Sequence, residues 1–236
     1  MSVSQHTIAG TVLTMPVRIR KADQHSAMFS VPAAAAQRLI DYSGLKIFEY
    51  LPGRAILLQL LVRYIDGDLG KYHEYGTAFM VNKPGTTQRG LRAMGKAATF
   101  IHRLPVDQEF TLEAGRTIWG YPKIMADFNV REGRKFDFDV SADGQLIAGI
   151  EFSPGLPVPM PAAQDLTTYS HLDGVTRETS SQMRSSGTRT RLGGARIRLG
   201  DHPYADELAS LGLPKRAMMT QSVANVEMSF GDARAV

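Results

Sequence analysis

The sequence contains no cysteine. This absence excludes a disulfide framework, a thiolate metal site and a cysteine nucleophile. It is typical of a protein that works in a reducing cytoplasm, which is the location that we expect. The first ten residues are polar and lack the basic stretch and long apolar core of a secretory signal, so secretion is not expected.

Long apolar runs and several familiar catalytic motifs are also missing. No stretch approaches the roughly 20 apolar residues that a membrane helix needs, so no membrane partner is expected. The sequence has no phosphate-binding Gly-x-x-x-x-Gly-Lys-Ser/Thr, no Gly-x-Ser-x-Gly nucleophile elbow and no His-Glu-x-x-His zinc helix. Its six histidines are far apart in the sequence, and they predict no metal site.

The chain has enough apolar residues for a sizeable core. Hydrophobic residues make up 43% of its 236 residues. The formal net charge of +4 comes mainly from scattered arginines, and it suits an anionic small substrate as well as a nucleic acid. The proline-rich segment 154–161 is interpreted as a connector, so residues 1–236 are expected to form a single domain.

Strand patterns outnumber helix patterns along the chain. Helices are expected from Pro32 through four alanines to Gly44, and again over residues 205–211. The expected strands cover residues 11–20, 27–31, 54–65, 72–81 and 218–230, with one hairpin at 136–152 around Asp143-Gly144 and a second at 189–199 around Gly193-Gly194. The second hairpin would place arginines on one face and Leu192 on the apolar face. This order, without β-α-β alternation, predicts an antiparallel α+β or closed β architecture.

One lysine stands in unusual surroundings. Lys123 follows Tyr121-Pro122, precedes two large apolar residues, and lies in the segment that holds the single tryptophan. Desolvation disfavours the charged form of a lysine and frees an amine that can attack a carbonyl near neutral pH. The alternative is a structural lysine whose ammonium reaches solvent from a buried strand end.

Residues 115–123, Gly-Arg-Thr-Ile-Trp-Gly-Tyr-Pro-Lys, resemble a segment of the acetoacetate decarboxylase family. In that family the lysine after Tyr-Pro is the Schiff-base nucleophile, which maps onto Lys123. Upstream, residues 70–76 resemble the family's Gly-x-Tyr-x-Glu-x-Gly segment, whose active-site glutamate maps onto Glu74. Residues 196–203, 213–215 and 222–230 resemble its C-terminal third, so the resemblance covers most of the chain in the right order.

The resemblance implies an α+β fold built on a cone-like, largely antiparallel β-barrel with a few short helices, assembled as a homo-oligomer. It also implies a carboxy-lyase that needs no cofactor. Lys123 would form an imine with a β-keto acid such as acetoacetate, and the imine would accept the electrons that remain when carbon dioxide leaves. Acetoacetate decarboxylase is itself a standard example of an activated lysine nucleophile, and this mechanism comes to the present chain through the resemblance alone.

Several further residues are candidates for the site. Glu74 would act as general acid and base or orient the substrate, unless it is an ordinary strand residue in solvent. Gln59 stands where counting back from Glu74 places a second family glutamate, and its amide would need a partner if buried. Arg116 would bind the substrate carboxylate, or else pair with Glu113. Trp119 and Tyr121 are expected to wall the pocket and contact substrate, although such residues are more often part of a core.

One departure from the family pattern leaves the reaction open. Decarboxylases of the family carry a second lysine directly after the nucleophile, whereas this chain has Ile124. Relatives without that lysine resemble enzymes that use the imine for aldol condensation and dehydration of pyruvate with an aldehyde. A third possibility is a non-catalytic module that binds a polyanion through residues 184–198. Aromatic residues are absent there, so a keto acid and not a nucleic acid is the expected partner.

Overall fold

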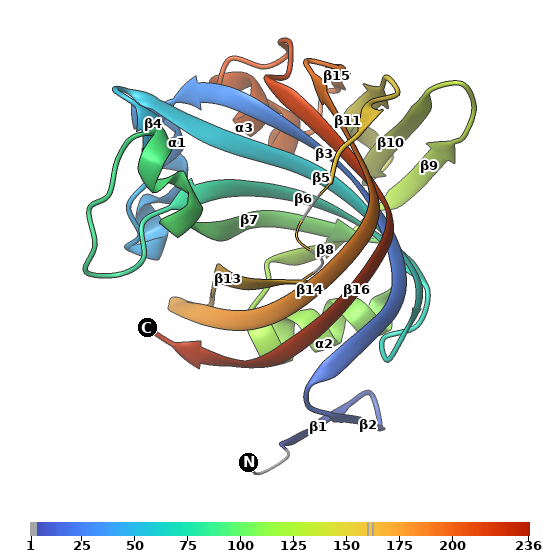
Figure 1. Cartoon of the computed structure of the whole chain (residues 1–236). Coiled ribbons are helices and arrows are strands. Elements are labelled where there is room, and N and C mark those ends of the chain that lie inside the picture. Colours follow the sequence, from blue (N-terminus) through green and yellow to red (C-terminus); the bar gives the residue numbers. More distant parts are fainter. Residues whose placement is uncertain (1–3, 160, 162) are drawn as a thin grey trace.

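The computed structural model describes residues 4–159, 161 and 163–236. Its centre is a closed barrel of seven strands, in which the pairing of β14 with β16 joins the two ends of the sheet (Figure 1). In order around the barrel the strands are β14 (Val175–Leu192), β13 (Ala163–Leu172), β7 (Ala98–Val106), β6 (Tyr72–Val81), β5 (Arg54–Gly67), β3 (Val17–Pro32) and β16 (Met219–Ala235). All neighbours in this ring are antiparallel except β7 and β13, so the expected largely antiparallel barrel is confirmed.

Shorter elements surround the barrel. The helices are α1 (Ala33–Ile40), α2 (Glu109–Trp119) and α3 (Pro203–Ser210), with 3-10 turns η1 (Asp41–Ser43) and η2 (Leu91–Lys96). β4 (Glu49–Leu51), β8 (Lys123–Met125) and β12 (Leu156–Pro157) extend the barrel sheet, and β1 (Gln5–Ile8) pairs with β2 (Thr11–Thr14). In the part of the chain that the structure describes, no helix is long and apolar enough to span a membrane.

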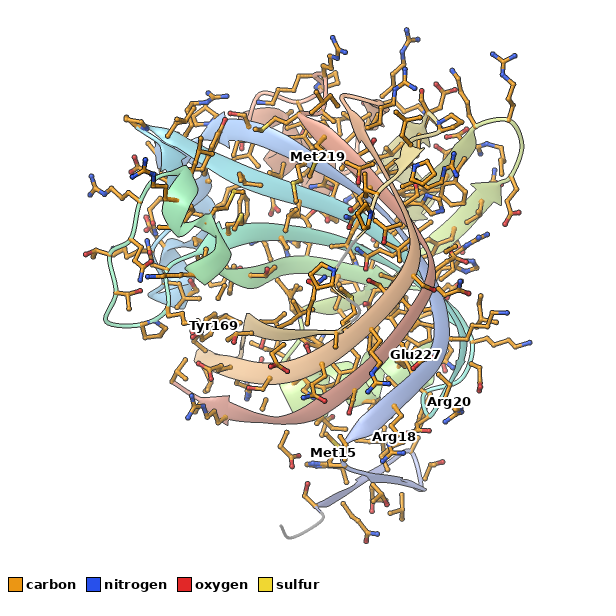
Figure 2. All side chains as sticks on the ribbon, in the orientation of Figure 1. Met15, Arg18, Arg20, Tyr169, Met219 and Glu227 are labelled. Carbon is orange, nitrogen blue, oxygen red and sulfur yellow. The ribbon has the colours of Figure 1, made fainter. Side chains whose placement is uncertain are left out.

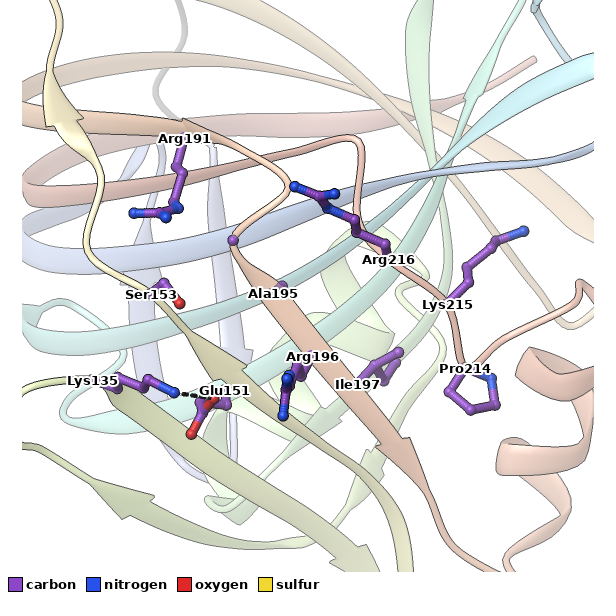
Figure 3. A pocket seen from close by; sticks show the side chains of 11 residues that line it. Lys135, Glu151, Ser153, Arg191, Ala195, Arg196, Ile197, Pro214, Lys215 and Arg216 are labelled. Atoms are coloured by element: carbon purple, nitrogen blue, oxygen red, sulfur yellow. Dashed lines mark hydrogen bonds and ion pairs between the residues drawn. The ribbon is translucent and has the colours of Figure 1, made fainter.

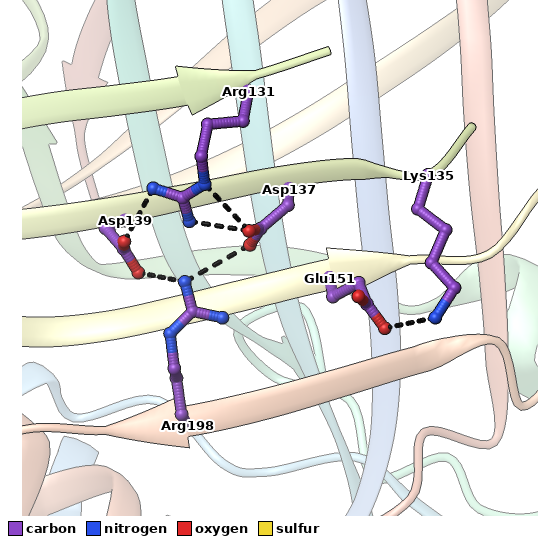
Figure 4. A network of polar contacts seen from close by, with 6 residues as sticks. All are labelled: Arg131, Lys135, Asp137, Asp139, Glu151 and Arg198. Carbon is purple, nitrogen blue, oxygen red and sulfur yellow. Dashed lines mark hydrogen bonds and ion pairs between the residues drawn. The ribbon is translucent and has the colours of Figure 1, made fainter. Parts of the chain in front are cut away.

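A second sheet lies on the outside of the barrel. It contains β15 (Ala195–Leu199), β11 (Gln145–Phe152), β10 (Phe136–Ala142) and β9 (Asp127–Arg131), in that order. Its inner face is apolar, and Phe138 of this sheet meets Tyr75 of the barrel edge to face. On its outer face, arginines and aspartates form a network of ion pairs (Figure 4). The alternation of apolar and acidic residues in β10 follows from these two environments.

The barrel strands are buried on both faces. On β5, Leu57 and Leu61 belong to the core between the barrel and the second sheet. Leu58 and Leu60 alternate with them and point into the barrel, where they line a cavity. The nearly continuous apolar run of this strand follows from burial on both sides.

Most of the expected elements are confirmed. β5 and β6 match the expected strands, and the Asp143-Gly144 turn joins β10 to β11 in a hairpin. The first helix begins after Pro32, and Gly44 ends its continuation η1 with a φ of 73°. The connector 154–161 contains β12, while its Met160 lies outside the described residues.

The expected hairpin around Gly193-Gly194 is wrong. β14 pairs with β13 and β16, whereas β15 pairs with β11 of the second sheet. Next to the glycines, Arg189 and Thr190 of β14 pair with β12 on one edge and with β16 on the other. β15 can therefore pair only elsewhere, and Gly193 and Gly194 connect one sheet to the other. Leu192, expected on an apolar face, is 80% exposed at this crossing.

Candidate active site

Helix α2 and strand β8 place Lys123 inside the barrel. The helix begins at Gln108, whose side chain accepts a hydrogen bond of 2.7 Å from the Thr111 amide, and it ends at Gly120 with a φ of 61°. The chain then runs parallel to β7, with Lys123 opposite Leu104. Successive strand residues point to opposite faces. Lys123 therefore faces the cavity and is 2% exposed.

The Lys123 ammonium is held by two oxygen atoms. Its Nζ lies 2.8 Å from Oε2 of Glu74 and donates a hydrogen bond of 2.9 Å to Oγ1 of Thr111. It also lies 5.2 Å from the centre of the Tyr72 ring, within range of a cation–π interaction. The structure thus brings together the lysine and the glutamate that sequence motifs singled out, and it adds Thr111 and Tyr72 to them.

Glu74 is positioned by a pair of tyrosines. It is 7% exposed on β6, and its Oε1 accepts a hydrogen bond of 2.9 Å from the Tyr64 hydroxyl. The Tyr64 and Tyr72 rings are stacked with their centres 4.2 Å apart. Burial, and next the charge of Glu74, raise the pKa of both hydroxyls well above the usual value. Both tyrosines therefore stay neutral, and Tyr64 remains a hydrogen-bond donor to Glu74.

Sequence reasoning missed Thr111 and Tyr64 as members of the site. The β5–β6 register pairs Val62 with Glu74 and Tyr64 with Tyr72, so these residues share one face. The position of the turn between β5 and β6 sets this register, so locating that turn in the sequence would have placed Tyr64 beside Glu74. Thr111 lies in helix α2, which was not expected.

A cavity of about 230 Å³ lies inside the barrel next to this pair. Most of its lining is apolar, with Leu58, Leu60, Val62, Leu69, Ile101, Leu104, Leu166, Met183, Met228 and Phe230 among the lining residues. Among the described residues that line it, Lys123 and Glu74 are the only charged ones. A ligand in this cavity would meet one cation, one carboxylate and a mostly apolar wall with a few uncharged polar side chains.

The two aromatic candidates, Trp119 and Tyr121, line the cavity as expected. The Trp119 indole nitrogen donates a hydrogen bond of 2.8 Å to the carbonyl of Gly231. The Tyr121 hydroxyl lies 3.3 Å from Oγ1 of Thr168, and burial raises the pKa of Tyr121 to about 12. The indole nitrogen and the hydroxyl both have hydrogen-bond partners in barrel strands, so both rings are fixed in place. Whether they contact substrate stays a prediction.

The other two candidates, Arg116 and Gln59, lie outside the cavity. Arg116 is exposed on α2, and its guanidinium donates a hydrogen bond of 3.2 Å to the carbonyl of Lys123. Gln59 is fully buried on the opposite face of β5, where its Oε1 accepts hydrogen bonds from Tyr75 and from Thr77. Counting residues back from Glu74 misplaced Gln59, because the β5–β6 register pairs it with Thr77 and puts it on the other face. The structure therefore gives these two no contact with a ligand beside Lys123.

The described side chains offer no metal site. Within residues 4–159, 161 and 163–236, no three histidine, aspartate or glutamate side chains come together closely enough to hold an ion. The Lys123–Glu74 pair can instead exchange a proton directly across the 2.8 Å that separates Nζ from Oε2. Such a pair can free an amine for attack on a carbonyl and later return the proton.

Solved structures of low sequence identity share this fold. One of acetoacetate decarboxylase from Legionella pneumophila has a TM-score of 0.66 at 16% identity and covers 94% of this chain and 87% of that chain. The enduracididine biosynthesis enzyme MppR was solved in complex with the condensation product of pyruvate and imidazole 4-carboxaldehyde. It has a TM-score of 0.65 at 17% identity, and the match covers 94% of this chain and 90% of that chain. An acetoacetate decarboxylase-like enzyme from Sphingomonas wittichii RW1 has a TM-score of 0.54 at 14% identity, and the match covers 92% of this chain and 93% of that chain.

The sequence itself matches one family. No curated protein is similar enough to be matched. The family model for acetoacetate decarboxylase matches residues 6–234, which is nearly the whole chain and includes both Glu74 and Lys123. This protein belongs to the acetoacetate decarboxylase family.

Proposed function

We propose that this protein is a cofactor-independent carboxy-lyase that converts a β-keto acid such as acetoacetate to a ketone and carbon dioxide. The observation that carries the proposal is the buried Lys123–Glu74 pair at the wall of a mostly apolar cavity. A buried amine with an acid–base partner is what imine formation requires.

The reaction begins when Lys123 transfers a proton to Glu74 and its neutral amine attacks the ketone carbon. Glu74 then protonates the departing hydroxyl, and loss of water leaves a protonated imine. The bond to the carboxylate breaks, carbon dioxide leaves, and the electron pair moves into the imine to give a neutral enamine. Protonation at carbon and hydrolysis of the imine release the ketone and restore the Lys123 amine. Tyr64 supports Glu74 throughout by its hydrogen bond to Oε1.

The charges that line the cavity favour decarboxylation. Once Lys123 is an imine, the described lining residues supply no second cation to pair with a carboxylate. A β-keto acid loses its carboxylate, so an imine cation and a carboxylate become a neutral enamine, which an apolar site favours. Pyruvate would keep its carboxylate through an aldol condensation and would need a lasting cationic partner.

The second candidate is aldol condensation and dehydration of pyruvate with an aldehyde. Its support is the fold shared with MppR, which was solved with a condensation product of pyruvate. In the sequence, Ile124 in place of the second family lysine also suggested it. Ile124 faces away from the cavity, however, because it follows Lys123 on β8. A lysine at this position would not line the cavity either, so its absence does not separate the two reactions.

Parallel assays separate the candidates. Purified protein is incubated with acetoacetate while carbon dioxide is measured, and with pyruvate and an aldehyde while enone absorbance is followed. Carbon dioxide release that is lost in Lys123→Ala and kept in Lys96→Ala, an exposed control, supports the lyase. Enone formation without carbon dioxide release would replace it with the aldolase.

A further inference from the structure

A larger hollow of about 650 Å³ lies outside the barrel, between the second sheet and the loop that precedes β16 (Figure 3). Five cationic side chains line it, with one acid, Glu151. They are Lys135, Arg191, Arg196, Lys215 and Arg216, and we call this hollow the basic cleft. Its excess of four positive charges, five cations against one carboxylate, equals the formal net charge of +4 of the whole chain. The remaining formal charges of the chain, 22 basic and 22 acidic residues once these five cations and one carboxylate are taken from the totals of 27 and 23, sum to zero.

The crossing between the two sheets shapes the basic cleft. Gly193 and Gly194 have φ values of 69° and 85°, which L side chains rarely adopt. A Cβ atom on Gly193 would lie 2.7 Å from Nε of Arg216, and one on Gly194 would lie 2.9 Å from Cδ of Arg191. The two bare glycines therefore allow both arginine side chains to lie against the turn, where Figure 3 shows them flanking the chain that leads into Ala195.

Two of the arginines have no partner within the described chain. Lys135 pairs with Glu151 at 2.8 Å, while Arg191 and Lys215 donate hydrogen bonds to the carbonyls of Pro154 and Leu211. The guanidinium groups of Arg196 and Arg216 make no hydrogen bond or ion pair with any side chain or carbonyl that the structure describes, while the backbone of Arg196 pairs with Glu151 in the sheet. Their guanidinium groups are available to a ligand.

This lack of partners is local to the basic cleft. Two positions further along β15, Arg198 is bonded to both Asp137 and Asp139, which Arg131 also contacts (Figure 4). Arg196 stands opposite Glu151 in the sheet, but Glu151 is bonded to Lys135 instead. The same sheet thus neutralises Arg131 and Arg198 on one part of its surface and leaves the Arg196 side chain in the cleft without a carboxylate partner.

We propose that the basic cleft binds a small molecule that carries two or more adjacent phosphoryl groups. Guanidinium groups match phosphate oxygens in paired hydrogen bonds, and several cations facing one hollow suit several adjacent negative charges. The hollow is roughly twenty times the volume of about 30 Å³ that one water occupies in the liquid, which exceeds the need of a single phosphate. No aromatic residue lines it, so it lacks the stacking surface that single-stranded nucleic acids use.

Isothermal titration calorimetry with inorganic tripolyphosphate tests this site. At low ionic strength we expect one tripolyphosphate per chain, bound more tightly than orthophosphate and progressively weakened by added salt. Replacing both Arg196 and Arg216 by alanine removes two charged hydrogen-bonding groups and should weaken binding about a hundredfold. Arg184→Ala removes an exposed arginine of β14 outside the cleft and should change the affinity by less than about twofold, since surface charges contribute little at a distance.

Three results would overturn the proposal. They are the absence of any heat of binding at low ionic strength at two different temperatures, equal affinity in the double variant, and tighter binding of a short RNA duplex than of tripolyphosphate. Arg196 and Arg216 are exposed, so the double variant keeps the fold, and circular dichroism checks this.

Discussion

At the residue scale, the reactive amine depends on Glu74. Glu74→Gln keeps an oxygen that can accept the Tyr64 hydrogen bond but removes the negative charge and the proton acceptor. We expect kcat/KM for acetoacetate to fall by about a hundredfold to ten-thousandfold, the usual range for loss of general acid–base catalysis. Carbon dioxide release measures the effect. Glu113→Gln, on the exposed side of α2, is the matched control, and equal activity of the two variants would exclude Glu74 from the chemistry.

His25 makes stability depend on pH. Its ring stacks on Phe136 with the ring centres 3.7 Å apart, and its Nδ1 lies 2.9 Å from Oγ of Ser222. Burial, and next the charge of Arg63, lower the pKa of His25 to about 4, against 6.5 for an ordinary histidine. His25 is therefore neutral in the folded protein across the range in which an unfolded chain would protonate it.

The sign of the effect follows from proton uptake. Between about pH 6.5 and pH 4 the unfolded chain binds more protons at His25 than the folded protein. The free energy of unfolding should therefore fall as the pH is lowered through this window and be insensitive to His25 above it. Urea unfolding at several pH values measures this. His25→Gln should flatten the decline, and an unchanged slope in that variant would mean that His25 does not cause it.

At the element scale, helix α2 and strand β8 are fitted to each other at Gly115. A Cβ atom on this glycine would lie 2.6 Å from both Cδ and Cε of Lys123. Gly115→Ala should displace the lysine side chain from Thr111 and Glu74, while alanine favours the helix by about 1 kcal/mol over glycine.

Disrupting the buried Lys123–Glu74 pair costs more than this gain, so we expect Gly115→Ala to lower both the melting temperature and kcat. Calorimetry measures the melting temperature and carbon dioxide release measures kcat, both on the same preparation. Gly95→Ala is the control, since a Cβ atom there meets nothing within 4 Å and should leave kcat unchanged. A Gly115→Ala variant with full activity would show that Lys123 can tolerate displacement.

Sequence reasoning succeeded at this scale where local patterns decide the structure. β6 and the Asp143-Gly144 hairpin were predictable because alternation and turn residues are local signals. Helix α2 escaped prediction because it holds Gly115 and three β-branched residues, which favour helix weakly, and packing against the barrel stabilises it. The Gly193-Gly194 hairpin was wrong because the partners of β14 and β15 are distant in sequence.

The site was predictable in part for a related reason. Lys123 and Glu74 stand in recognisable motifs, and the fold brings them to 2.8 Å. Gln59 was expected in the site, but the strand register places its side chain on the other face of β5. Arg116 was also expected there, but it lies on a helix that the sequence did not predict, and its position on that helix decides where its side chain points. Register and helix phase cannot be counted from residue spacing alone.

At the scale of the whole molecule, the contact between β14 and β16 closes the barrel around the cavity. Thr188 and Val223 are partners in this pairing, and both are buried. In a closed barrel the amides of both strands should be protected at successive positions, whereas an open sheet would leave every second amide of each strand to exchange rapidly.

Hydrogen exchange followed by NMR tests this closure. We expect protection along the middle of β14 and β16 similar to that of β5 and β6, and weaker protection in the peripheral β1–β2 pair. Fast exchange at alternate positions of residues 177–184 of β14, which pair with both β13 and β16, would contradict a closed barrel. Homo-oligomeric assembly and a cytoplasmic location, which the sequence also suggests, stay predictions.

The imine at Lys123 is the central step of the proposed reaction, and reductive trapping tests it most directly. The protein is incubated with acetoacetate or with pyruvate, treated with borohydride and mapped by mass spectrometry, with Lys123→Ala as the control. We predict a mass increase on the peptide that carries Lys123, none in the control, and more trapping with acetoacetate than with pyruvate. A folded protein that forms no adduct with any keto acid, or forms one at another lysine, would contradict the proposed chemistry.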